Sequence, residues 1–353
     1  MRRRLLRVLV PLTAACSTPP AAAPRLELLS ETTLMENDSS FIGVVSGFAL
    51  SSSGSFLVAD KRNATLHEFG RDGAHVRRVG RRGEGPGEWA NGPQLIVWGD
   101  DSTFVVADGF MARALSYPSI VERWHRLRPT WSLPMGYVHG TFIFNRVDAA
   151  SRSSLEFLRG VADSAVRGGP FTAMMGRNPI LDNYFSFLAV APMRGDSIGV
   201  FVMNTDRLFV GSLPVGPWDS VDVPTRHRRG AVPAVMAELG RGNTAVAEKN
   251  LYVPSFPVAL AFLPGSRDFA LVTSDRAMVG GSRMMGKLYL SVVRWRTRRA
   301  CVDAPLALPE EPQPMVTFRG DTLFAIAQVV EGDQPRTTIK AFRIDTRDCD
   351  LGT

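Results

Sequence analysis

A short pattern recurs six times along the chain: a polar or glycine turn, a run of apolar residues, and a second polar turn. The copies lie at residues 54–60 (GSFLVAD), 102–108 (STFVVAD), 140–148, 196–206, 267–275 and 321–327. Short apolar runs bounded by turn residues are typical of β-strands, and a continuous run indicates a strand covered on both faces. Because a missed repeat misassigns the whole fold, this pattern constrains the architecture more than any other feature.

The spacing of the copies predicts a ring of small sheets. They begin between about 38 and 71 residues apart, which leaves room for the four strands of a propeller blade. After the last copy only one more strand is expected, at residues 338–344, so the fourth must come from elsewhere. We expect residues 25–32 to pair with the strand around Ala341. The predicted fold is all-β: a six-bladed β-propeller closed by an N-terminal strand in the last blade, with residues 25–353 as a single domain.

Two segments fit this template less well. Leu155, Leu158 and Val161 keep helical spacing, which predicts a short helix at residues 155–166. Residues 226–250 read as an insertion between the fourth and fifth blades, and such insertions lie on one face of a propeller.

The first 16 residues, MRRRLLRVLVPLTAAC, have a basic start, a short apolar stretch and small residues ahead of Cys16, the pattern of a signal peptide. The stretch resembles a bacterial lipoprotein signal, although Thr13 stands where the family usually has leucine. That resemblance implies lipidation of Cys16, and cleavage after residues 21–23 is the alternative. Residues 17–24 would be a tether. We therefore expect an extracytoplasmic protein, periplasmic or attached to the outer membrane by a lipid anchor.

The charge and the cysteines restrict the partners and cofactors. The formal net charge is +7, of which the arginines before residue 8 supply +4, so the remainder does not indicate nucleic-acid binding. If Cys16 carries lipid, Cys301 and Cys349 are a candidate disulfide, and two unpaired thiols are the alternative. No Cys/His cluster predicts a structural zinc site. We expect a monomer without a cofactor.

Residues 48–108 resemble a known family. The features are an apolar strand ending in Ala-Asp, then Asn63, an aromatic residue ahead of Asp-Gly, and the loop at residues 80–89 (GRRGEGPGEW). Together they resemble the bacterial six-bladed β-propeller lipoproteins related to NHL-repeat proteins. Thr65 stands where that family often has arginine, and Trp89 where it has Phe or Tyr. The resemblance implies a fold but does not indicate which activity the protein has, because propellers host many functions.

The loops that follow the repeated strands are expected on one face of the ring. The ligand-face candidates are Arg62, Asn63, Glu84, Arg113, Arg146, Arg207 and Arg276. A ring of arginines favours an anionic ligand. The alternative is that aspartates in the same loops, such as Asp60 and Asp108, pair with these arginines and stabilise the turns.

Catalytic residues are not identified, because the chain has no nucleophile elbow, phosphate loop or HExxH motif. The leading hypothesis is a non-catalytic protein that recognises a protein, peptide or glycan with one propeller face. Trp124, Trp131 and Trp218 are candidate sugar-stacking residues. The alternative is a metal-dependent lactonase or lyase with its site in the central channel. The types of residue that hold calcium in propeller lactonases occur at Glu84, Asn145, Asn204 and Asp275.

Overall fold

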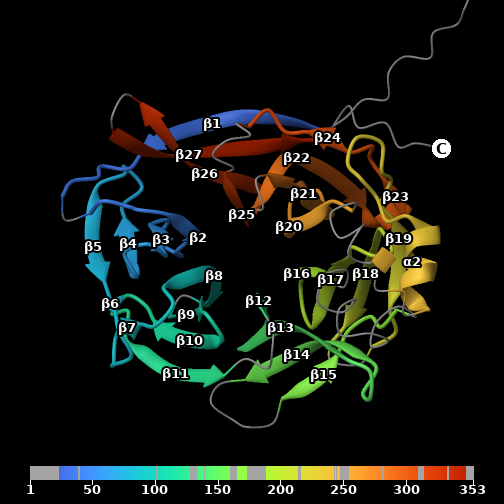
Figure 1. Cartoon of the computed structure of the whole chain (residues 1–353). Coiled ribbons are helices and arrows are strands. Elements are labelled where there is room, and N and C mark those ends of the chain that lie inside the picture. The colour runs from blue at the N-terminus through green and yellow to red at the C-terminus, as the bar shows by residue number, and fades with distance from the viewer. Residues whose placement is uncertain are drawn as a thin grey trace, which may run out of the picture.

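The computed structural model describes residues 24–38, 40–100, 102–127, 133–138, 140–159, 165–172, 188–213, 216–241, 243, 245–246, 254–279, 282–308, 314–331 and 334–346. These residues form six antiparallel sheets arranged in a ring (Figure 1). The predicted six-bladed β-propeller is therefore confirmed. No helix in this part of the chain is long and apolar enough to span a bilayer.

The first three blades follow one another along the chain. Blade 1 contains β2 (Val45–Leu50), β3 (Phe56–Asp60), β4 (Thr65–Phe69) and β5 (His75–Val79). Blade 2 contains β8 (Pro93–Asp100), β9 (Thr103–Asp108), β10 (Met111–Ser116) and β11 (Glu122–Leu127). Blade 3 contains β12 (Pro134–Val138), β13 (Thr141–Asp148), β14 (Ser153–Arg159) and β15 (Val166–Gly168). Between blades 1 and 2, β6 (Arg81–Arg82) pairs in parallel with β7 (Glu88–Trp89).

The other three blades include the closure of the ring. Blade 4 contains β16 (Leu188–Pro192), β17 (Ser197–Val202), β18 (Arg207–Ser212) and β19 (Asp219–Asp222), and α2 (Pro233–Gly240) follows it. Blade 5 contains β20 (Phe256–Leu263), β21 (Asp268–Val279), β22 (Ser282–Arg294) and β23 (Arg299–Ala300), with the 3-10 turn η1 (Trp295–Thr297) and β24 (Ala304–Pro305) at its edge. Blade 6 contains β25 (Met315–Arg319), β26 (Thr322–Glu331), β27 (Gln334–Asp345) and β1 (Arg25–Thr33).

All six copies of the repeated pattern are the second strand of their blade. The buried apolar side chains group into six clusters, and each cluster joins two neighbouring blades. At the joint between blades 1 and 2, for example, Leu57 and Ala59 pack with Phe104 and Val106. A strand that packs against blades on both sides needs apolar residues at consecutive positions, which explains the continuous runs in the sequence.

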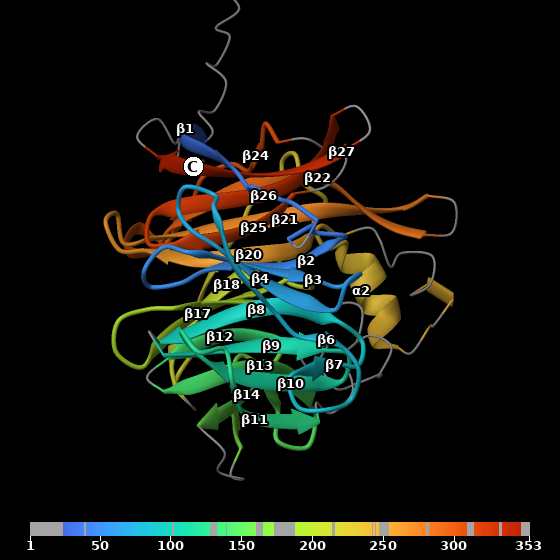
Figure 2. The same ribbon diagram turned by 90° about the vertical axis from the view of Figure 1, so that its left-hand side faces the viewer.

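Blade 6 is built from both ends of the described chain. β1 pairs antiparallel with β27, and Ser30 lies opposite Ala341. Figures 1 and 2 show the two strands side by side at the outer edge of the ring. The predicted closure is therefore confirmed. Because blade 6 also packs on blade 1 through Ile326 and Ile339, this seam has an apolar joint like the others.

The helix predicted at residues 155–166 is wrong, because residues 153–159 form β14. Leu155 and Phe157 point toward blade 4, whereas Leu158 points toward blade 2. The spacing that resembled a helix comes from a strand that is buried on both faces. Within the segment 226–250, α2 packs on the joint between blades 4 and 5 through Val235.

Candidate functional site

The strand directions give the ring two different faces. The hairpin face carries the turns between first and second strands, such as β2–β3. The connection face carries the turns between second and third strands together with the connections between blades. On that face the N–H of Lys61, after β3, donates to the carbonyl of Val44, before β2, at 3.2 Å. Figure 2 shows α2 and the β6–β7 pair on this same side of the ring.

Asp60 ends β3 and is completely buried at the connection face. Its carboxylate accepts hydrogen bonds from the backbone N–H groups of Gly43 at 2.8 Å, Val44 at 3.0 Å and Arg62 at 3.0 Å. The Asn63 side chain donates to it at 2.7 Å. The carboxylate thus ties the segment that leads into the blade to the turn after its second strand, and buried backbone donors remain paired.

The same arrangement recurs in other blades. The Asp108 carboxylate accepts from the backbone N–H groups of Ala90 at 3.1 Å and Asn91 at 2.8 Å. In blade 3 the side-chain oxygen of Asn145 accepts from the backbone of Leu133 at 2.6 Å. These polar strand ends are therefore components of the blade structure.

Three of the predicted ligand-face arginines are paired within their own blades. Arg113 lies 3.1 Å from Asp108 and 2.9 Å from Glu122, and it packs over the Trp89 ring at 5.4 Å. Arg146 lies 2.8 Å from Glu156, and Arg207 lies 2.6 Å from Asp222. The side chain of Arg276 lies outside the described residues. The pairing matches the alternative in which opposite charges stabilise the turns.

The loop at residues 80–89 is held by its own contacts. Glu88 accepts from the backbone N–H of Gly85 at 2.9 Å and from Arg81 Nε at 2.7 Å, and these two bonds lower the pKa of its carboxyl. Gly80 has a φ of 90°, and a Cβ there would meet the Trp89 indole at 2.1 Å. Trp89 is buried at the joint between blades 1 and 2, whereas Glu84 is exposed. The loop therefore stabilises the passage from one blade to the next.

An exposed apolar group lies beside Arg62 and Asn63 and was not identified from the sequence. Phe41 is 42% exposed and Val44 is 45% exposed, and Asn63 donates to the carbonyl of Phe41 at 3.2 Å. Phe110, in the turn after β9, is 54% exposed.

The turn that contains Lys61 and the turn that contains Phe110 both pack against residues 91–92. A Cβ on Gly92 would lie 2.6 Å from the Lys61 carbonyl, and a Cβ on Gly109, next to Phe110, would lie 2.4 Å from the Asn91 side chain. We call Phe41, Val44, Lys61, Arg62 and Phe110 the blade 1–2 patch.

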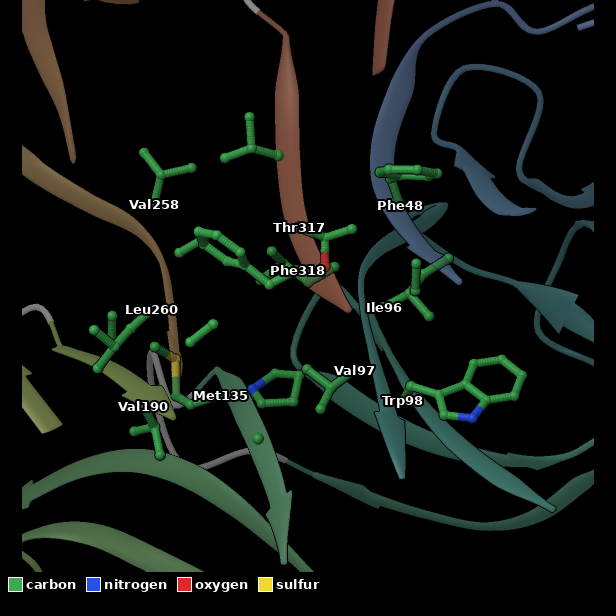
Figure 3. Close-up of a pocket in the computed structure, with 18 of the residues that line it drawn as sticks. Phe48, Ile96, Val97, Trp98, Met135, Val190, Val258, Leu260, Thr317 and Phe318 are labelled. Carbon is green, nitrogen blue, oxygen red and sulfur yellow. The ribbon is translucent and has the colours of Figure 1, made fainter. Parts of the chain in front are cut away.

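The second candidate region is the central channel, a cavity of about 780 Å³. It is lined by the first strands of all six blades, β2, β8, β12, β16, β20 and β25, and each is the edge strand of its sheet. Apolar side chains such as Phe48, Trp98, Met135 and Val258 surround it (Figure 3). Among the described lining residues, only Tyr137 and Arg319 have titratable side chains.

The candidate calcium ligands do not form a site. Of the four, only Asn145 lines the channel. Asp275 accepts from Ser255 Oγ at 2.6 Å and Tyr289 Oη at 3.1 Å, and burial together with the Asp275 charge raises the pKa of Tyr289 to about 12. Asn204 is buried in blade 4, and Glu84 is exposed in a loop. Across the described residues, no three His, Cys, Asp or Glu side chains are grouped to hold a metal ion.

Cys301 is buried and disulfide-bonded. Cys349 and Cys16 lie outside the described residues, so the Cys301–Cys349 pair and the lipidation of Cys16 stay predictions.

No known protein family and no curated protein matches the chain in sequence. A Bacteroides fragilis protein described as a "putative exported protein" has a similar structure, with 13% identity, a TM-score of 0.60, and coverage of 91% of this chain and 95% of that one. A DUF4221 family member from Bacteroides vulgatus has 9% identity and a TM-score of 0.61, covering 92% and 99%. A virginiamycin B lyase from Staphylococcus aureus has 10% identity and a TM-score of only 0.47, covering 90% and 99%. The similarities to the two Bacteroides proteins show the propeller fold alone, and the relation to NHL-repeat lipoproteins stays a prediction.

Proposed function

We propose that this protein is an extracytoplasmic binding protein, anchored by lipid at Cys16, that recognises a protein or peptide through the blade 1–2 patch. The observation that carries this proposal is that exposed apolar residues and cationic residues are neighbours on one face, where the carbonyls of Val44 and Phe41 accept hydrogen bonds from the turn after β3. Val44 and Phe41 lie beside the turn that contains Lys61 and Arg62.

The composition of the patch favours a partner with apolar and acidic side chains. Aromatic residues and arginine are enriched at the centres of protein interfaces. Among the described residues, no carboxylate forms an ion pair with Lys61, Arg62 or the nearby Arg82, whose guanidinium donates to the Arg62 carbonyl at 3.3 Å. These cations are available to pair with acidic groups of a partner.

A protein or peptide fits better than a glycan, because two of the candidate sugar-stacking residues are used in packing. Trp124 stacks edge-on against Phe142 with ring centroids 6.2 Å apart. Trp218 packs on Gly211, where a Cβ would lie 2.7 Å from the indole. Trp131 lies outside the described residues. The lactonase or lyase alternative is not favoured, because the described channel wall carries no carboxylate that would bind a metal.

Selection from a displayed library of random peptides tests this proposal. We expect the enriched peptides to combine aromatic and acidic residues, and to bind Phe41→Asp/Phe110→Asp about 30-fold or more weakly than the unmodified protein. A matched control, Val76→Asp/Val166→Asp, changes two valines of comparable exposure (57% and 45%) on the outermost strands β5 and β15 and should bind normally. Peptides that bind all three proteins equally, or a selection without enrichment, would contradict the proposal.

A further inference from the structure

The channel wall has a chemistry of its own. Phe48, Val97, Met135, Val258 and Phe318 come from five different blades and line one cavity (Figure 3). Its volume of about 780 Å³ lies within the range of small-molecule sites, which are mostly apolar and contain a few polar groups that orient the ligand. The five residues of β25 give the wall a length of about 16 Å. An elongated apolar molecule would therefore be removed from water along most of its length.

Arg319 is the one cationic side chain in the described part of this wall. It ends β25 at the hairpin face and reaches across the seam to blade 1, where Nη1 donates to the Ser51 carbonyl and Nη2 to the Ser52 carbonyl. Within the described residues no carboxylate lies within ion-pair distance of it. A guanidinium has five N–H groups, so three are left over after these two bonds. The contacts with blade 1 thus fix the guanidinium at the channel mouth without neutralising its charge.

We propose that the central channel is a second binding site, which takes a small amphipathic molecule with an elongated apolar body and one anionic head group such as a carboxylate. The apolar body lies along the wall formed by the first strands, and the head group pairs with Arg319 at the hairpin face. Arginine favours carboxylates because its planar N–H groups match their two oxygens. A cationic head group would have no carboxylate to pair with in the described wall, so the wall favours an anionic one. This site is separate from the blade 1–2 patch, which lies on the opposite face.

Isothermal titration of the full-length chain with dodecanoate and with dodecanol tests the proposal. The two probes share the same apolar chain and differ in the charge of the head group. We expect dodecanoate to bind with one molecule per chain and more tightly than dodecanol. In Arg319→Gln the dissociation constant for dodecanoate should rise about tenfold or more, because a hydrogen-bonded ion pair is lost, while that for dodecanol stays unchanged. Arg319→Lys, which keeps the charge, should recover much of the affinity.

Two further variants separate the channel from the rest of the molecule. Val258→Trp narrows the cavity and should weaken both probes. Arg194→Gln removes an exposed arginine from the corresponding β16–β17 turn on the same face and should change neither. The proposal is overturned if neither probe binds, if Arg319→Gln and Arg319→Lys leave dodecanoate binding unchanged, or if Arg194→Gln weakens binding as much as Arg319→Gln does.

Discussion

Two regions of the same blades differ in chemistry. The first is the rim of the connection face, where second strands end at Asp60 and Asp108, and the second is the wall of the channel. At the rim, buried groups such as Asp60 and Asp108 are saturated with hydrogen bonds from backbone and side-chain donors. At the wall, most side chains are apolar, and Arg319 keeps N–H groups that no carboxylate neutralises in the described structure. Asp60 and Asp108, which stand out in the sequence, are therefore structural. The channel wall is made by first-strand residues that carry no motif of this kind.

Replacing Asp60 should have the largest effect on stability. In Asp60→Ala, the N–H groups of Gly43 and Val44 and the Asn63 side chain lose a buried acceptor. We expect a loss of about 4 kcal/mol in the free energy of unfolding, measured by urea denaturation. Asp72→Ala removes an exposed turn aspartate that accepts from one N–H at 3.0 Å and should cost about 0.5 kcal/mol. Equal losses in the two variants would contradict the contrast between rim and surface.

The stability of the folded protein should also depend on pH, because the buried His67 side chain lies close to Asp60. This side chain is 1% exposed, 3.0 Å from Thr65 Oγ1 and 4.0 Å from Asp60. Burial lowers the pKa of His67 from 6.5 to about 4, against the opposing charge of Asp60.

Below pH 6.5 the unfolded chain binds a proton that the folded protein excludes, so stability is complete above that pH and declines as the pH falls toward 4. The free energy of unfolding should fall by about 3 kcal/mol over this range. Urea denaturation at pH 7.5, 6, 5 and 4 should show this decline reduced in His67→Gln and retained in His125→Gln, a change at an exposed histidine. An identical pH dependence in His67→Gln and the unmodified protein would argue against a neutral buried imidazole.

The smallest effects concern two glycines of the channel wall. A Cβ on Gly47 in β2 would lie 2.7 Å from the Leu95 backbone nitrogen, so Gly47→Ala should cost about 2 kcal/mol. A Cβ on Gly136 in β12 meets its nearest neighbour, Val190, at 3.7 Å, so Gly136→Ala should change stability by less than about 0.5 kcal/mol. Thermal unfolding of both variants measures the difference. If Gly136→Ala were the more damaging variant, the wall would be packed differently from the structure.

The sequence predicted the parts of the fold that have a local signal. Runs such as residues 56–59 and 104–107 identify second strands because packing on both faces requires consecutive apolar residues. The same double packing produced the wrong helix at residues 155–166, since alternate residues of β14 serve two different joints. The arginines were predicted on one face, but pairs such as Arg146 with Glu156 depend on strand register, which short motifs do not encode.

By itself, the sequence determined the strands of a six-bladed propeller, because strand and turn preferences act over short segments. It also predicted that β1 completes blade 6, because the chain supplies only three strands for that blade after the fifth. Only the tertiary structure decided which residues face the channel. The first strands, such as VSGFAL in β2 and PMGYV in β12, share no pattern. Arg319 meets Ser51 across a separation of 268 residues. Such a contact exists only when the ring closes, because neither segment carries a local preference for the other.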